Sequence, residues 1–212
     1  MSIVNIDYIF KITVLGDVYT GKTTLIDQLK YPSYKSEEDK YLSTVGVEYQ
    51  TVTMEHINEK DDKIIKLGIW DTSGDEIFAG ILESYYHNIS AIVAVFSADK
   101  VESFENIKKK IKYFRENYGN TPKILLIKNK NDLENKVSQE EIDEVIRKYQ
   151  CLYFSCNSLT GENVFLAFDS LKNNIYEEFK SSNLESKFPG ITIVNKNFPK
   201  DRSYFSCWGF LW

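Results

Sequence analysis

One stretch constrains this chain more than any other: VLGDVYTGKT, which runs from Val14 to Thr23. Gly16 and Gly21 bound its central turn, and a lysine and a threonine follow the second glycine. The residues before it, 8–15 (YIFKITVL), are apolar and β-branched, so they predict a buried strand. The residues after it, TLIDQL, place apolar side chains at helical spacing. The pattern predicts a strand that ends in a tight glycine turn and opens a helix.

A turn of this kind suits an anion. Its successive backbone N–H groups form an anion-binding nest, and the helix N-terminus adds partial positive charge. The spacing G-x-x-x-x-G-K-[ST] is the signature of a phosphate-binding loop, in which Lys22 would lie along the β- and γ-phosphates and Thr23 would ligate Mg²⁺. The alternative is a chance glycine turn with an exposed lysine, which the flanking strand and helix disfavour. The sequence therefore predicts a nucleoside phosphate site.

Apolar runs and helical periods alternate along the next 150 or so residues. Ser138 and Glu141 make a capping box for one helix, and Thr160 is expected to cap the last. This order predicts an α/β fold with a mostly parallel six-stranded sheet, helices on both faces, and ligands at the carboxyl ends of the strands. The expected strands are 8–15, 47–57, 63–70, 91–96, 124–128 and 152–155.

Length and composition fit one globular domain, 1–181, followed by a tail, 182–212, that shows no helical period. The net charge of −5 argues against a nucleic-acid partner. Three scattered cysteines are too few for a disulfide or zinc framework and favour a reducing compartment. Residues 1–10 lack a secretory signal, and no apolar run is long enough to span a membrane. We expect a cytoplasmic monomer.

A second motif, Asp71-Thr72-Ser73-Gly74, directly follows the strand KIIKLGIW. An aspartate at a strand end can hold a water molecule that ligates Mg²⁺, and the Gly74 N–H can approach a γ-phosphate because no Cβ intervenes. Alone, this pattern would be an ordinary turn. One strand beyond a phosphate-binding loop, it predicts a metal and γ-phosphate sensor.

A third motif, Asn129-Lys130-Asn131-Asp132, follows the strand ILLIK. The Asp132 carboxylate can accept hydrogen bonds from the N1–H and N2–H₂ edge of guanine, which adenine does not offer. A polar loop after a strand is the alternative, and the order of the three motifs argues against it. Residues 155–157 (SCN) follow the last strand and could offer backbone N–H groups to the guanine carbonyl. Together these residues predict guanine specificity.

The ordered set GDVYTGKT, a threonine in the first long loop, WDTSG, NKND and SCN resembles the small GTPases of the Ras superfamily. VGVEY, KLGIWDTSG and ESYYHNIS resemble the Rab branch in particular. The resemblance covers roughly residues 8 to 180. It implies a P-loop NTPase G domain, a GTP/GDP switch that needs Mg²⁺, and a role in vesicle trafficking.

The resemblance also assigns roles to residues. Segments 31–49 and 71–86 would be the two switches, which bind effectors, an exchange factor and a GTPase-activating protein. It implies catalytic roles for Lys22, Thr44, Gly74 and Asp75, and Mg²⁺ ligation by Thr23, Thr44 and, through water, Asp71. The expected nucleotide contacts are Val18, Tyr19, Thr20, Gly21, Lys22, Thr23, Thr24, Tyr34, Thr44, Gly74, Asn129, Lys130, Asp132, Ser155, Cys156 and Asn157.

The chain departs from the family at Asp75, where a glutamine usually orients the attacking water. An ionised aspartate is shorter and cannot donate a hydrogen bond, so we expect slow intrinsic hydrolysis. Val18 and Tyr19 are larger than the residues usual there and would crowd the same space. One alternative is a GTP-binding effector platform that does not hydrolyse. Another, an ATP-using P-loop enzyme, is disfavoured by NKND.

The tail is a second departure, because five residues follow Cys207 and no C-a-a-X box exists. Residues 204–212 instead hold five aromatic side chains. We favour docking of this segment onto its own domain or onto a partner, because one short aromatic stretch anchors weakly to a membrane. The alternative is a weak peripheral contact with the cytosolic face of endomembranes.

Overall fold

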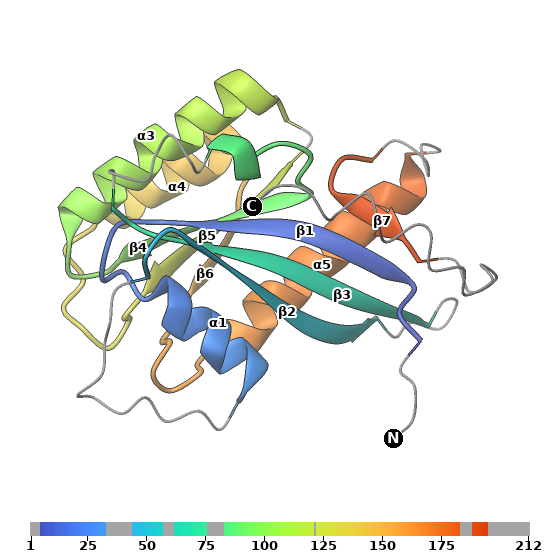
Figure 1. Ribbon diagram of the computed structural model, residues 1–212. Coiled ribbons are helices and arrows are strands. Elements are labelled where there is room, and N and C mark those ends of the chain that lie inside the picture. The colour runs from blue at the N-terminus through green and yellow to red at the C-terminus, as the bar shows by residue number, and fades with distance from the viewer. Residues whose placement is uncertain are drawn as a thin grey trace.

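The computed structural model describes residues 5–32, 44–56, 62–75, 83–120, 122–182 and 188–194. Strands and helices alternate through most of this range (Figure 1). In chain order the elements are β1 (Tyr8–Leu15), α1 (Lys22–Lys30), β2 (Val47–His56), β3 (Lys63–Thr72), the 3₁₀ turn η2 (Glu83–Tyr85), β4 (Ala91–Ser97), α3 (Val101–Tyr118), β5 (Lys123–Asn129), α4 (Gln139–Tyr149), β6 (Leu152–Ser155), α5 (Val164–Ser181) and β7 (Ile191–Ile193).

The strands form one mostly parallel sheet in the order β2-β3-β1-β4-β5-β6. β1 pairs in parallel with β3 and β4, and β5 in parallel with β4 and β6, whereas β2 is antiparallel to β3. The carboxyl ends of the five parallel strands therefore meet at one edge of the sheet. The fold class inferred from the sequence is confirmed.

Helices cover both faces of the sheet (Figure 1). α1 and α5 bury apolar side chains against one face, and α3 and α4 bury theirs against the other, so the core has two clusters. β4 lies in the middle and is buried along its whole length. None of the helices in the described part of the chain is both long and apolar enough to cross a bilayer.

A seventh strand, β7, joins this sheet, although the sequence predicted six strands and a tail from residue 182. β4 begins at Ala91, opposite Ile12, so the amino half of β1 has an open edge on that side. Ile191–Ile193 fills it, antiparallel to Tyr8–Phe10. Phe188, just before the strand, is 8% exposed and packs into the core. The segment 188–194 thus belongs to the folded domain, at the far end of β1 from the phosphate-binding loop (Figure 1).

Of the two helix caps predicted from the sequence, the one at Ser138 is confirmed and the one at Thr160 is not. Ser138 is the N-cap of α4, and its Oγ accepts a hydrogen bond from the Glu141 N–H at 3.3 Å. The cap predicted at Thr160 is wrong, because α5 begins at Val164 with Asn163 as its N-cap. Asn163 has a left-handed backbone (φ 59°), so the helix cannot extend back through it.

Candidate nucleotide-binding site

The turn between β1 and α1 is held together by its own polar groups. The Nζ of Lys22 and the Oγ1 of Thr20 both donate to the backbone carbonyl of Asp17, at 3.0 and 2.9 Å. Lys22 is only 6% exposed, and this burial lowers its pKa to about 8, although Asp71 acts in the opposite direction. A phosphate at this turn would meet a largely desolvated ammonium together with backbone N–H groups, where electrostatic attraction is strong.

Helix α3 braces the same turn. The Asp17 carboxylate accepts a hydrogen bond from Asn106 Nδ2 at 2.9 Å and pairs with Lys110 Nζ at 3.2 Å. Both partners are about ninety residues away along the chain, and no motif in the sequence indicated them. Asn106 and Lys110 fix the side chain of Asp17. The turn is therefore anchored to α3, which covers the opposite face of the sheet from α1.

Three oxygen-bearing side chains gather beside the turn. The Thr23 hydroxyl donates to Asp71 Oδ2 at 2.6 Å and lies 2.8 Å from the Thr44 hydroxyl oxygen. Asp71 is fully buried, and its Oδ1 has no hydrogen-bond partner among the described residues. A buried carboxylate oxygen without a partner is costly unless a cation or water satisfies it.

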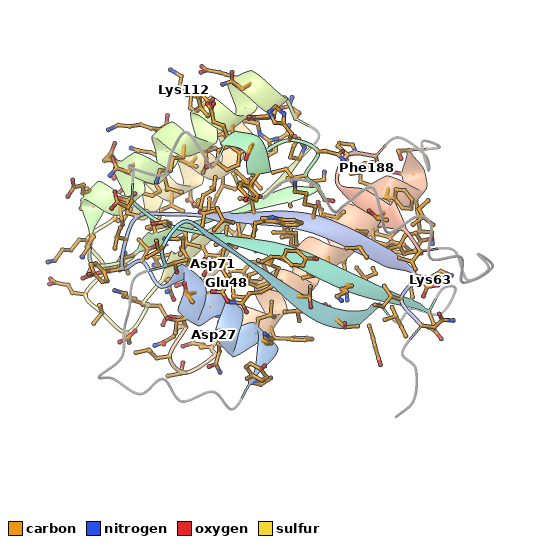
Figure 2. The ribbon with its side chains drawn as sticks, viewed as in Figure 1. Asp27, Glu48, Lys63, Asp71, Lys112 and Phe188 are labelled. Atoms are coloured by element: carbon orange, nitrogen blue, oxygen red, sulfur yellow. The ribbon has the colours of Figure 1, made fainter. Side chains whose placement is uncertain are left out.

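The electrostatics around Asp71 fit a divalent cation. Burial raises the pKa of this carboxyl group, and the negative charges of Glu48 and Asp27 add to the shift, while the Thr23 hydrogen bond opposes it. Glu48 lies opposite Asp71 in the β2–β3 register, and Figure 2 shows both carboxylates on the side toward α1. Mg²⁺ prefers oxygen ligands and retains several waters, so two hydroxyls, one carboxylate, phosphate oxygens and water suit it.

Asn129, the first residue of the NKND motif, is fully buried and ties three loops together. Its Nδ2 donates to the Thr20 carbonyl at 2.8 Å and to the Ser158 hydroxyl at 3.0 Å, while its Oδ1 accepts from the Ser158 N–H at 3.0 Å. A Cβ at Gly21 would lie 2.4 Å from this amide, so the close approach requires glycine. Asn129 therefore serves the site by holding its loops.

Gly74 lies directly against the phosphate-binding loop. A Cβ added there would come within 2.2 Å of the Val18 nitrogen and 2.4 Å of the Asp17 carbonyl carbon, both backbone atoms. The next residue, Asp75, lines the main cavity and also a second cavity of about 390 Å³ at the start of α3. The end of β3 thus reaches the edge of the phosphate-binding loop where a γ-phosphate would lie.

One cavity of about 610 Å³ collects most of the predicted site residues. Tyr34 lies outside the described residues. The predicted site residues that do not line the cavity are Thr20, Asp71, Asn129, Ser155 and Cys156. Five further lining residues were not predicted from the sequence, because they lie beside the motifs and carry no signature of their own: Val45, Ser73, Leu133, Ser158 and Leu159. The cavity is lined by Val18, Tyr19, Gly21, Lys22, Thr23, Thr24, Thr44, Val45, Ser73, Gly74, Asp75, Lys130, Asp132, Leu133, Asn157, Ser158 and Leu159.

Comparison with known proteins agrees with this geometry. A family model described as the Ras family matches residues 11–177. The chain is 35% identical over 178 residues to the Ras-related protein Rab-11B of Dictyostelium discoideum, covering 83% of this chain and 78% of that protein. It is 34% identical over 171 residues to Rab-13 of Rattus norvegicus, covering 80% and 81%. It is 29% identical over 206 residues to Rab-8B of Bos taurus, covering 95% and 96%. The chain therefore belongs to the Ras family, as a Rab-like small GTPase.

Proposed function

We propose that this GTPase is a molecular switch that binds GTP and GDP with Mg²⁺, hydrolyses GTP slowly, and acts in intracellular vesicle trafficking. The observation that carries the proposal is the single cavity in which Lys22, Gly74 and Asp132 lie together. These residues follow the ends of different strands, and each suits a different part of the nucleotide. Lys22 suits the phosphates, Gly74 the γ-phosphate in particular, and Asp132 the base. The trafficking role is supported by the likeness to Rab proteins alone.

Each part of the cavity has an assigned task. Lys22 binds the β- and γ-phosphates, and the Gly74 N–H donates a hydrogen bond to the γ-phosphate. Thr23 and Thr44 would ligate Mg²⁺, and Asp71 would hold one of its waters through Oδ1, which has no hydrogen-bond partner in the described part of the chain. The bound Mg²⁺ would neutralise charge that develops on the phosphate oxygens during hydrolysis.

Slow hydrolysis is inferred from Asp75. Its side chain lines the cavity beside Gly74, where the attacking water must be oriented. A carboxylate there repels the phosphate oxygens and cannot donate a hydrogen bond to them. Val18, whose branched side chain lines the same region, reduces the room for water.

The test is single-turnover hydrolysis of bound GTP, comparing the native protein with Asp75→Gln. We expect the glutamine to raise the rate at least tenfold, which corresponds to about 1.4 kcal/mol off the barrier. Glu102→Gln is the matched control, because it neutralises a carboxylate that lines only the second cavity. Equal rates for the native protein and Asp75→Gln would show that Asp75 does not slow hydrolysis.

A second candidate, a GTP-binding effector platform that does not hydrolyse, is favoured by the same pair of side chains, Asp75 and Val18. The two candidates predict different effects of a Rab-type GTPase-activating protein on GTP hydrolysis. Stimulated turnover in the native protein would support the switch, because such a protein can supply the missing groups in trans. Absence of turnover with and without it would support the platform.

Partners would meet the molecule at the switches, 31–49 and 71–86. On the described part of this surface, Val45 is 79% exposed and Tyr49 is 52% exposed. The ring centroids of Tyr49 and Trp70 lie 4.6 Å apart. Exposed aromatic and aliphatic side chains beside a nucleotide cavity suit effector docking. The aromatic segment 204–212 lies outside the described residues, and its contact with a partner or the cytosolic face of endomembranes stays a prediction.

A further inference from the structure

We propose that Asn157 is a positioning residue for base recognition: it holds the Asp132 carboxylate in the orientation that accepts the N–H groups of guanine. The inference rests on the proposed binding of GTP and GDP and adds a second residue to base specificity. The two residues belong to different loops, β5–α4 and β6–α5, and both line the cavity.

The direct contact is a hydrogen bond from Asn157 Nδ2 to Asp132 Oδ1, 2.8 Å long. Asn157 is only 5% exposed, whereas Asp132 is exposed. Among the described residues, this is the one side-chain hydrogen bond that the Asp132 carboxylate makes. A buried amide thus holds an exposed carboxylate.

The orientation of that amide follows from its surroundings. Asn157 Oδ1 accepts hydrogen bonds from the backbone N–H groups of Leu159 at 2.9 Å and Thr160 at 3.1 Å. Flipping the amide would place its NH₂ group against two N–H donors and its oxygen against a carboxylate. The nitrogen must therefore face Asp132.

The backbone of Asn157 is held as firmly as its side chain. Its N–H donates to the Glu162 carbonyl at 3.1 Å, and its carbonyl accepts from the Gly161 N–H at 2.9 Å. The β6–α5 loop is thus a closed turn around this residue, and the amide that reaches Asp132 projects from a fixed base.

Guanine recognition needs both oxygens of the carboxylate, one for N1–H and one for N2–H₂. Asn157 uses one lone pair of Oδ1 and leaves the other lone pairs free for the base. Without the amide, the exposed Asp132 side chain would rotate freely, and binding would have to order it. Pre-orientation therefore increases affinity for guanine, and most for ligands that use both hydrogen bonds.

The experiment compares two substitutions of different character. Asn157→Asp keeps the oxygen that Leu159 and Thr160 require but replaces the donor by an oxygen that faces Asp132. Asn157→Ser keeps a short acceptor, adds no charge and cannot reach Asp132. Asn135→Ser is the matched control, because this exposed asparagine in the β5–α4 loop does not line the cavity. Each protein is loaded with fluorescent GDP, and GDP, IDP and ADP displace it.

IDP separates positioning from general loop damage, because inosine keeps N1–H and lacks the 2-amino group. We expect both Asn157 variants to bind GDP about tenfold more weakly, the order expected for ordering one side chain. We also expect their preference for GDP over IDP to shrink severalfold, while Asn135→Ser keeps native values. Melting temperatures of the loaded proteins report on folding.

An unchanged GDP-to-IDP ratio in both variants would overturn the inference, even if melting temperature falls, because Asn157 would then only brace its loop. Native affinity for GDP in both variants would overturn it as well. A native protein that binds ADP as well as GDP would instead overturn the proposed function, so the two failures are distinguishable.

Discussion

At the scale of single residues, Gly74 shows how closely the end of β3 approaches the phosphate-binding loop. An alanine Cβ would lie within 2.4 Å of two backbone atoms, which cannot move away cheaply. We expect Gly74→Ala to slow single-turnover GTP hydrolysis at least tenfold (about 1.4 kcal/mol) and to change GDP affinity much less, because GDP lacks the γ-phosphate. An unchanged rate would show that Gly74 does not serve the γ-phosphate.

The two described cysteines, Cys151 and Cys156, provide a test of burial. Both are free thiols in the core, and burial raises the pKa of each to about 12 from an ordinary value of 9.0. In a Cys207→Ser variant, we expect iodoacetamide at pH 8 to label neither thiol in the folded protein and both after unfolding in guanidinium. Rapid labelling of the folded protein would contradict their burial.

The same shift has a consequence for stability. Well below pH 9 the thiols are neutral in both the folded and the unfolded state, so their ionisation does not affect the free energy of unfolding there. As pH rises from about 9 toward 12, the unfolded chain loses the protons first, and the folded state loses stability. Urea denaturation should therefore show a lower free energy of unfolding at pH 10.5 than at pH 8.

At the scale of elements, Phe188 is the residue that anchors β7. Its ring packs edge-to-face on the ring of Phe179, with 6.1 Å between the two ring centroids, and only 8% of the residue is exposed. We expect Phe188→Ala to lower the free energy of unfolding by about 3 kcal/mol. Phe165→Ala is the matched control, because Phe165 is 60% exposed and its loss should cost about 0.5 kcal/mol or less. Equal losses would show that β7 is not anchored by this ring.

Some elements could be read from the sequence because their signals are local. A few neighbouring residues are enough to predict β1, the glycine turn that follows it, and the cap of α4. β7 could not, because a three-residue strand has no period and forms only where β4 leaves an edge of β1 open. The start of α5 was misplaced because Thr160 looks like a cap, while a left-handed Asn163 decides the boundary.

The same division applies to the site. Lys22 and Asp132, which line the cavity, and Asp71, which contacts Thr23 beside it, could be singled out because each lies in a motif at a strand end. The brace of Asn106 on Asp17 joins residues 89 positions apart, and the contact of Asn157 with Asp132 joins two loops. Such pairs depend on tertiary packing, which no local pattern in one sequence encodes.

At the scale of the whole molecule, the domain boundary can be tested by truncation. A chain that ends at Val194 keeps β7 and the hydrogen bond from the Val194 N–H to the Asp7 carbonyl, whereas one that ends at Ser182 loses both. We expect the longer form to melt at the native temperature when loaded with GDP, and the shorter form to melt several degrees lower. Equal melting temperatures would place the boundary at residue 182.

Base selection tests the central claim most directly, because the proposed function assigns every motif in the cavity to the binding of one nucleotide. The measurement is displacement of fluorescent GDP from the Mg²⁺-loaded native protein by GDP and by ADP. We expect ADP to compete at least about 100-fold more weakly, because adenine offers no N–H groups to the carboxylate oxygens of Asp132 that face the base. ADP that competes as well as GDP would contradict the assignment of a guanine-nucleotide switch.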